Sequence, residues 1–99
     1  MTRDTMDKVR VSGKNNKHKV LLYALSTCAW CKKTKKFPNE NGIEYEYVDV
    51  DLANDEDHEK IRQDIINRGN EPSYPTIIVD NKKVITGFRI DLLKEALEL

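Results

Sequence analysis

The chain has 99 residues, which is enough for one domain with a small core and too few for two. Its 17 basic and 17 acidic side chains cancel, so its charge does not support a nucleic-acid or membrane partner, and neither is expected. No apolar run approaches the roughly 20 residues that a membrane-spanning helix needs. The first residues, MTRDTMD, lack the apolar core of a signal peptide. We expect a cytoplasmic protein in which residues 1–7 are disordered and residues 8–99 form the domain.

The first half of the chain predicts two strands and a helix. Valines in residues 8–12 and an apolar run in residues 19–25 favour strands, and the turn-forming residues between them predict that the two pair as a hairpin. A helix is expected from Ala29. Pro38 should end this helix near Phe37 or kink it there, because a proline inside a helix removes one hydrogen bond.

The second half begins with residues 43–50, which alternate as a strand does. A helix is expected over residues 54–68, capped by Asn54 or Asp55 and ended by Gly69. The remaining predicted elements are a strand over residues 76–79, a tight turn, a returning strand over residues 84–86 and a helix from Asp91. This order predicts an α/β fold with a mixed central sheet of four strands, an added N-terminal hairpin strand and three flanking helices. The two strands joined by the first helix should be parallel.

Two cysteines, Cys28 and Cys31, lie where a predicted strand ends and a helix begins. Such a close pair is a poor structural staple, because closing a short loop removes little entropy from the unfolded chain. The positive end of the helix favours the thiolate of Cys28, and Cys31 lies one turn further, where it can attack a mixed disulfide. We therefore expect a redox-active disulfide and no bound cofactor or metal. A zinc site is the less favoured interpretation, because the chain adds only His18 and His58 to the pair.

Four lysines follow the cysteine pair: Lys32, Lys33, Lys35 and Lys36. We interpret them as an ordinary solvated helix face, although Lys32 is close enough in sequence to add positive potential near the sulfurs. The strand sequence before the pair, VLLYAL, contains no carboxylate. The proton acceptor for Cys31 is therefore unassigned.

Three motifs, LSTCAWC, SYPT and TGFRID, resemble those of the glutaredoxin family in the thioredoxin superfamily, and the match runs over residues 19–99. The resemblance implies a thioredoxin fold and thiol–disulfide oxidoreductase activity, with Cys28 as the nucleophile and Cys31 as the resolving thiol. It also implies that Pro75 is cis and packs beside the disulfide. A bound thiol or peptide would then pair with the backbone of Tyr74 as an added strand.

Departures from the family pattern bear on the electron donor. Ala29 and Trp30 replace the Pro-Tyr that typical glutaredoxins carry between their cysteines, and only Gly87 and Asp91 carry over from the late glutathione-binding motif. The GFR-x-D segment looks more like the NrdH-redoxins, which take electrons from thioredoxin reductase. The LSTCAWC run resembles archaeal glutaredoxin-like proteins, including methanoredoxins, which use a different small thiol. The expected donor is a low-molecular-weight thiol or a thioredoxin reductase-like protein, and the expected substrates are disulfide-containing proteins or small-thiol mixed disulfides.

Two further residues are candidates for substrate binding. Trp30 is either a partly exposed flat contact for a partner or is packed on the loop near Tyr74. Arg89 either pairs with a carboxylate or sulfonate of a small thiol or is an exposed arginine that begins a helix and has no partner. The sequence thus predicts a monomeric dithiol reductase. The alternative is a binding module in which two copies share an iron–sulfur cluster through Cys28 and bound thiols.

Overall fold

The computed structural model describes residues 8–99, and the predicted disorder of residues 1–7 lies outside them. Five strands form one mixed sheet in the order β1-β3-β2-β4-β5. The strands are β1 (Val9–Val11), β2 (Val20–Ala24), β3 (Tyr45–Asp49), β4 (Thr76–Val79) and β5 (Lys83–Thr86). The helices are α1 (Ala29–Glu40), α2 (Asp55–Asn67) and α3 (Ile90–Ala96), with a short 3-10 turn η1 (Val50–Leu52). Strands β2 and β3 are parallel and the other neighbours are antiparallel, which confirms the predicted α/β class.

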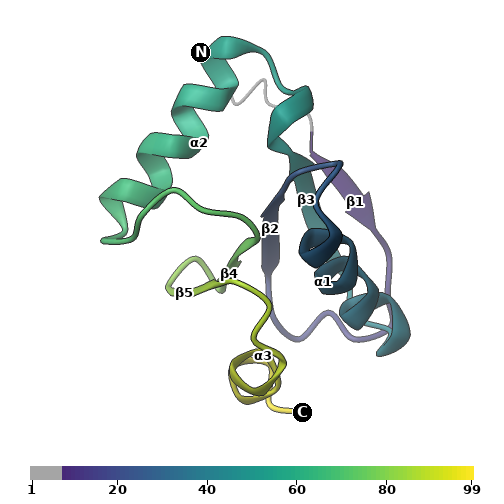
Figure 1. Ribbon diagram of the computed structural model, residues 1–99. Coiled ribbons are helices and arrows are strands. Elements are labelled where there is room, and N and C mark those ends of the chain that lie inside the picture. Colours follow the sequence, from purple (N-terminus) through teal and green to yellow (C-terminus); the bar gives the residue numbers. More distant parts are fainter. Residues whose placement is uncertain (1–7) are drawn as a thin grey trace, which may run out of the picture.

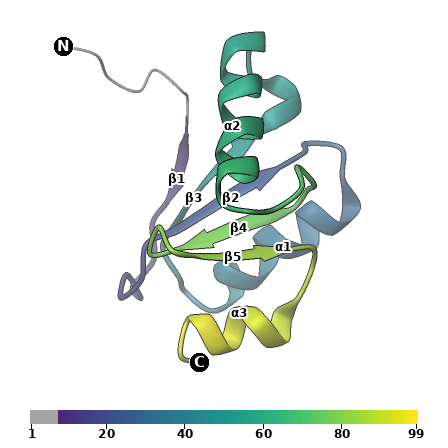
Figure 2. The ribbon, with the colours of Figure 1, turned by 90° about the vertical axis from the view of Figure 1, so that its left-hand side faces the viewer.

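The sheet lies between two helical layers. Helices α1 and α3 cover one face and α2 covers the other (Figures 1 and 2). Strand β2 is therefore buried on both sides: Leu22 packs in the cluster beneath α1 and α3, whereas Tyr23 packs in the cluster beneath α2 with Ile61 and Ile65. Burial on both faces explains why its sequence is a continuous apolar run. Among residues 8–99 no helix is long and apolar enough to cross a bilayer.

The first strand pairs differently from the prediction. Strand β1 is antiparallel to β3, with Val9 opposite Tyr47, so the predicted hairpin between β1 and β2 is wrong. Both edges of β2 are occupied by β3 and β4, which leaves β1 the outer edge of β3. Arg10 supports this pairing with an ion pair of 2.6 Å to Glu44.

The loop between β1 and β2 is consistent with this arrangement, because it crosses the start of β3 instead of making a tight turn. Asn15 forms an isolated parallel bridge with Ile43 and exchanges backbone hydrogen bonds of 2.9 Å with Gly42 and Glu44. A Cβ at Gly13 would lie 2.5 Å from the Gly42 carbonyl oxygen. The close approach of these two backbone segments therefore requires glycine at position 13.

Helix α1 continues through Pro38 to Glu40, so the expected stop near Phe37 is wrong. A proline in the last turn costs one hydrogen bond without interrupting a following turn. The backbone beyond it remains well bonded: the N–H of Ile43 donates to the Pro38 carbonyl at 2.9 Å, and the Asn41 side-chain amide donates to the Phe37 carbonyl at 2.8 Å. These bonds close the helix after the proline.

The second helix and the last hairpin follow their local signals. The side chain of Asn54 accepts a hydrogen bond of 2.7 Å from the backbone N–H of Asp57, and Gly69, with φ +87°, follows the end of α2. Between β4 and β5, Asp80 and Asn81 both have positive φ, and the N–H of Lys82 donates to the Val79 carbonyl at 3.1 Å, which closes a tight turn. The predicted positions of these elements are confirmed to within a residue or two.

Candidate active site

Cys28 is the N-cap residue of α1, at the end of the loop that leaves β2. Its backbone is extended, with φ −87° and ψ 122°, and its sulfur accepts a hydrogen bond of 3.3 Å from the backbone N–H of Cys31. The first N–H groups of a helix have no partner within the helix, and together with the helix dipole they favour a negative charge at this position. Cys28 is half-buried, so its thiol is held by the helix terminus and still open to solvent on one side.

The two thiols differ in acidity. A hydrogen bond from the Cys31 side chain, helped by the backbone N–H groups of Cys31 and Trp30, lowers the pKa of Cys28. Burial raises the pKa of Cys31 to about 12, and the neighbouring Cys28 adds to this rise. Cys31 is 0 % exposed, and its sulfur accepts a hydrogen bond of 3.3 Å from the backbone N–H of Leu25. Both cysteines are free thiols, so the structure shows the reduced pair with Cys28 as the more acidic member.

The lowered pKa of Cys28 predicts how its alkylation depends on pH. Because the thiolate is the reacting form, alkylation by iodoacetamide should remain fast below about pH 8.5, the ordinary pKa of a free cysteine, and should fall only as the pH drops through the lower pKa of Cys28. Cys31 should stay unmodified throughout this range. Peptide mass mapping of the native protein after timed alkylation measures both sites. A midpoint at the ordinary value, or preferential labelling of Cys31, would contradict the assignment.

The loop before Cys28 is anchored by Asp51, which the sequence did not suggest as a site residue. One carboxylate oxygen accepts the backbone N–H of Ser26 at 2.8 Å and the other accepts its hydroxyl at 2.5 Å. These bonds lower the pKa of Asp51, so the carboxylate stays ionised. A signal was available: Ser26 and Asp51 each follow one of two parallel strands, and the carboxyl ends of parallel strands meet at one edge of a sheet.

Trp30, between the two cysteines, is 56 % exposed and packs on a neighbour in the TGFRID motif. Its ring centroid lies 5.6 Å from that of Phe88, with the planes tilted by 34°, and the ammonium of Lys33 lies 4.6 Å from the indole centroid. The structure therefore favours the exposed contact surface over packing on the loop near Tyr74. It also adds Phe88, which lies within the TGFRID motif but was not selected from the sequence as a site residue.

The predicted residues Tyr74, Pro75 and Gly87 lie together at the start of β4 and the end of β5. The Tyr74–Pro75 peptide bond is cis, as the resemblance implies. Pro75 is buried, and its carbonyl oxygen accepts a hydrogen bond of 2.8 Å from the N–H of Gly87. Tyr74 and Cys28 pack against the same core cluster. The fold thus brings the SYPT segment to the core region beside the cysteine pair.

Arg89 and Asp91 bind each other at the start of α3. Arg89 is the N-cap residue of α3, and its guanidinium lies 3.3 Å from the Asp91 carboxylate. The bond from Arg89 lowers the pKa of Asp91. Their side chains are 54 % and 69 % exposed, so Arg89 is exposed at the start of a helix as the second interpretation has it, but it differs from that interpretation in having a partner, Asp91.

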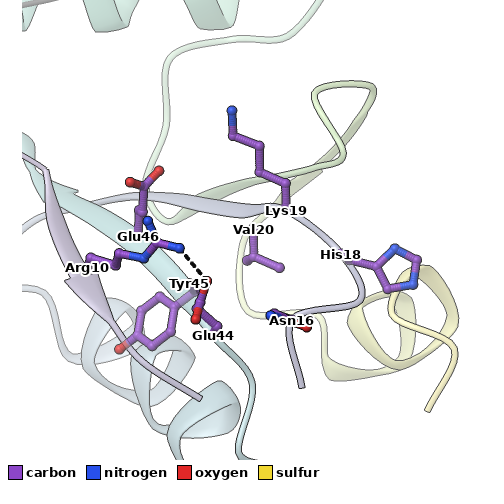
Figure 3. Close-up of a pocket in the computed structure, with 8 residues that line it drawn as sticks. All are labelled: Arg10, Asn16, His18, Lys19, Val20, Glu44, Tyr45 and Glu46. Atoms are coloured by element: carbon purple, nitrogen blue, oxygen red, sulfur yellow. Dashed lines mark hydrogen bonds and ion pairs between the residues drawn. The ribbon is translucent and has the colours of Figure 1, made fainter. Parts of the chain in front are cut away.

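A hollow of about 390 Å³ lies elsewhere on the molecule and contains no cysteine (Figure 3). It is lined by Val20 and Tyr45, the first residues of β2 and β3, and by polar side chains that include the Arg10–Glu44 ion pair. Cys28 follows the opposite, carboxyl end of β2, so the hollow is separate from the candidate active site. Within the described part of the chain, no group of three or more His, Cys, Asp or Glu side chains is arranged to hold a metal ion.

An acidic thiol at a helix N-terminus, with a buried thiol one turn further on and a mixed sheet beneath, defines a dithiol protein of the thioredoxin-fold class. Comparison with known proteins narrows this class. The family model for glutaredoxin matches residues 20–84, and the chain therefore belongs to the glutaredoxin family. An uncharacterized glutaredoxin-like 8.6 kDa protein of Clostridium pasteurianum is 33% identical over 69 residues, which cover 70% of this chain and 84% of the relative. Family membership supports a thiol–disulfide oxidoreductase-like function.

Solved structures agree with this assignment and confirm the thioredoxin fold. A glutaredoxin from Methanosarcina mazei superimposes with a TM-score of 0.83 at 37% identity, over 93% of this chain and 88% of its own. The methanoredoxin of Methanosarcina acetivorans superimposes with a TM-score of 0.82 at 38% identity, over 88% of this chain and 90% of its own. The chain is thus similar to archaeal members of the family over nearly its whole length.

Proposed function

We propose that the protein reduces disulfides in proteins or small molecules through a dithiol mechanism. The observation that carries this proposal is the asymmetry of the two thiols. Cys28 is half-buried at the N-terminus of α1 with a lowered pKa, whereas Cys31 is fully buried, with its pKa raised to about 12 by burial. Only the first thiol combines a lowered pKa with access to a substrate, so Cys28 is expected to attack first and Cys31 second.

Two exchanges complete one turnover. The Cys28 thiolate attacks one sulfur of a substrate disulfide, R–S–S–R′, which forms Cys28–S–S–R and releases R′–S⁻. The thiolate of Cys31 then attacks the Cys28 sulfur, which forms the Cys28–Cys31 disulfide and releases R–S⁻. The substrate has gained two electrons and the protein has lost two. The two protons of the dithiol balance those taken up by the two leaving thiolates, and an external reductant restores the dithiol.

We place substrate binding on the residues around the pair. The exposed face of Trp30, whose ring packs at a tilt against Phe88, offers a flat apolar contact next to Cys28. The backbone of Tyr74, before Pro75, is the proposed edge for a bound peptide. Arg89 is available to a small anionic thiol only in competition with its own Asp91, because the two side chains already bind each other.

The proposed setting is a reducing one. The electron donor is a low-molecular-weight thiol or a thioredoxin reductase-like protein, and the protein works as a cytoplasmic monomer without a bound cofactor. The Gly87 and Asp91 positions, which a glutathione-type ligand would contact, support the first donor, whereas the surrounding GFR-x-D segment supports the second.

The midpoint potential of the Cys28–Cys31 pair tests the proposal. The protein would be equilibrated in thiol redox buffers, its free thiols trapped by alkylation, and the trapped thiols counted by mass. A two-electron midpoint between about −200 and −300 mV is expected for a cytosolic reductant. The Cys31→Ser variant is the control and should show no intramolecular transition. Absence of a reversible intramolecular disulfide in the wild type, or a cluster bound to the purified protein, would contradict the dithiol mechanism.

A further inference from the structure

The resolving step poses an electrostatic problem. Cys31 is 0 % exposed and packs in an apolar cluster with Leu22, Ile77 and Leu93, yet it must become a thiolate to attack the mixed disulfide. Burial of a charge in such a place is unfavourable unless a polar or oppositely charged group compensates it. Strand β2 contributes no charged side chain to this cluster, so the compensating group must come from another element.

Lys35 is the candidate for the group that compensates the charge of the Cys31 thiolate. It lies four residues after Cys31 on α1, a spacing that places two side chains on the same face of a helix. Its side chain is only 20 % exposed, and its ammonium lies 2.9 Å from a carboxylate oxygen of Asp49 and 4.0 Å from the ring centroid of Tyr47. Lys36, the next residue, points outward with a side chain that is 72 % exposed. Lys35 is thus fixed by Asp49 and Tyr47, and the predicted solvated helix face does not include it.

The anchor of Lys35 lies beside the backbone that binds the Cys31 sulfur. Asp49 is opposite Ala24 in the parallel pairing of β2 and β3. Leu25, which follows Ala24 in the chain, donates its N–H to the sulfur of Cys31. While burial raises the pKa of Cys31, the positive charge of Lys35 opposes that rise. The cation is therefore held on the helix face of Cys31, with its anchor next to the strand residue that binds the Cys31 sulfur.

Two carboxylates also lie at this end of the sheet. Asp49 and Asp51 approach from the end of β3 and from η1, and each is already bound, Asp49 to Lys35 and Asp51 to Ser26. The thiol of Cys28 faces Cys31 from the start of α1. The cluster residues that β4 and α3 pack against Cys31 are apolar.

We propose that Lys35, held by Asp49 and by the ring of Tyr47, is a positioning residue that stabilises the Cys31 thiolate in the resolving step. The proposal rests on the dithiol function proposed above. In the mixed disulfide the sulfur of Cys28 carries no charge, so its repulsion of a second thiolate is gone. Lys35 and the N–H of Leu25 then remain to favour the anion.

The step is balanced without an added base. Cys31 loses its proton to solvent, and its thiolate attacks the sulfur of Cys28. The new bond forms between the two cysteines, the Cys28–S–R bond breaks, and R–S⁻ leaves with the electron pair and takes up one proton. Lys35 exchanges no proton in this step and acts only through its positive charge.

A stopped-flow reaction with 5,5′-dithiobis(2-nitrobenzoate) separates the two exchanges. Attack by Cys28 releases one thionitrobenzoate at a rate proportional to reagent concentration. Attack by Cys31 releases a second at a rate independent of that concentration. In Lys35→Met the second phase should be about tenfold slower at neutral pH, and its pH profile should shift upward by about one unit, because one pKa unit is a tenfold change in thiolate population. The first phase should change by less than about twofold. Lys35→Arg should restore the second phase, and Lys36→Met is the matched control.

Each outcome has a defined meaning. An unchanged second phase in Lys35→Met, or equal slowing of both phases, would overturn the role of Lys35 while leaving the dithiol mechanism intact. Failure of the wild type to release a second thionitrobenzoate would instead overturn the dithiol mechanism and this proposal with it. If Lys35→Met does not fold because Asp49 is left unpaired, the double variant with Asp49→Asn removes both charges, and the same slowing of the second phase is expected.

Discussion

Replacing Cys28 with serine is expected to abolish catalysed reduction of every disulfide substrate, by a factor of about 10³ or more, because a serine hydroxyl is not ionised near neutral pH and is a poor nucleophile toward sulfur. The fold should be retained. Cys28 is the N-cap residue of α1, and its sulfur accepts the N–H of Cys31. Serine is among the preferred residues for an N-cap, so the substitution keeps the cap while removing the thiol.

Two measurements together make this test specific to the nucleophile. Insulin reduction with dithiothreitol as donor reports catalysis, and the thermal unfolding midpoint reports folding. The midpoint for Cys28→Ser should not fall below that of the wild type. Thr27→Ser is a suitable control, because Thr27 is exposed and directly precedes Cys28. Normal insulin reduction by Cys28→Ser would assign the first attack to another group, and the mechanism proposed here would be wrong.

Local sequence signals predicted well where Cys28 lies in the fold. The start of α1 at Ala29 and the capping position of Cys28 follow from a strand that ends, a short loop and a helix that begins. The cap of α2, at Asn54 of the two residues expected, and the tight turn after β4 were also predicted from local sequence. In each case the residues that determine the local structure are neighbours in the chain, so a short stretch of sequence is enough to predict it.

Pairing between distant segments was not predictable in the same way. Residues 8–12 have the composition of an edge strand, but their partner depends on which sheet edges the rest of the chain leaves free. Since β3 and β4 occupy both edges of β2, β1 pairs with β3. Hydrophobic pattern and turn residues predict that a strand exists, while the choice of partner is set by the whole sheet.

Lys35 also differs from the neighbouring lysines through a contact with a distant segment that local sequence does not predict. In sequence it is one of four lysines on a helix, and a solvated face was the natural interpretation. In the structure Lys36 is exposed as expected, while Lys35 binds Asp49, a residue 14 positions away at the end of β3. Ser26 and Asp51 show the same pattern, because each carries its role only when two parallel strands bring their ends together.

Replacing Cys31 with serine is expected to trap the intermediate. The sulfur of Cys28 would still attack a disulfide, but a hydroxyl cannot displace the bound thiol. Reaction with 5,5′-dithiobis(2-nitrobenzoate) should then release one thionitrobenzoate per chain instead of two, because the variant has only one of the two cysteines. The adduct should persist on Cys28 and be visible by intact mass. The serine occupies a slightly smaller volume and its oxygen can still accept the N–H of Leu25, so the fold should be kept.

The fate of the trapped species distinguishes small substrates from protein substrates. Cys28 is half-buried, so a second small thiol can reach its mixed disulfide from solvent and release the product. Cys31→Ser should therefore retain activity on small-thiol adducts while accumulating covalent complexes with protein disulfides, seen as higher bands on a non-reducing gel that dithiothreitol removes. Release of both thionitrobenzoates by Cys31→Ser would mean that a group other than Cys31 resolves the mixed disulfide. In that case the buried position of Cys31 would be structural, and the electrostatic role of Lys35 would have no reaction to serve.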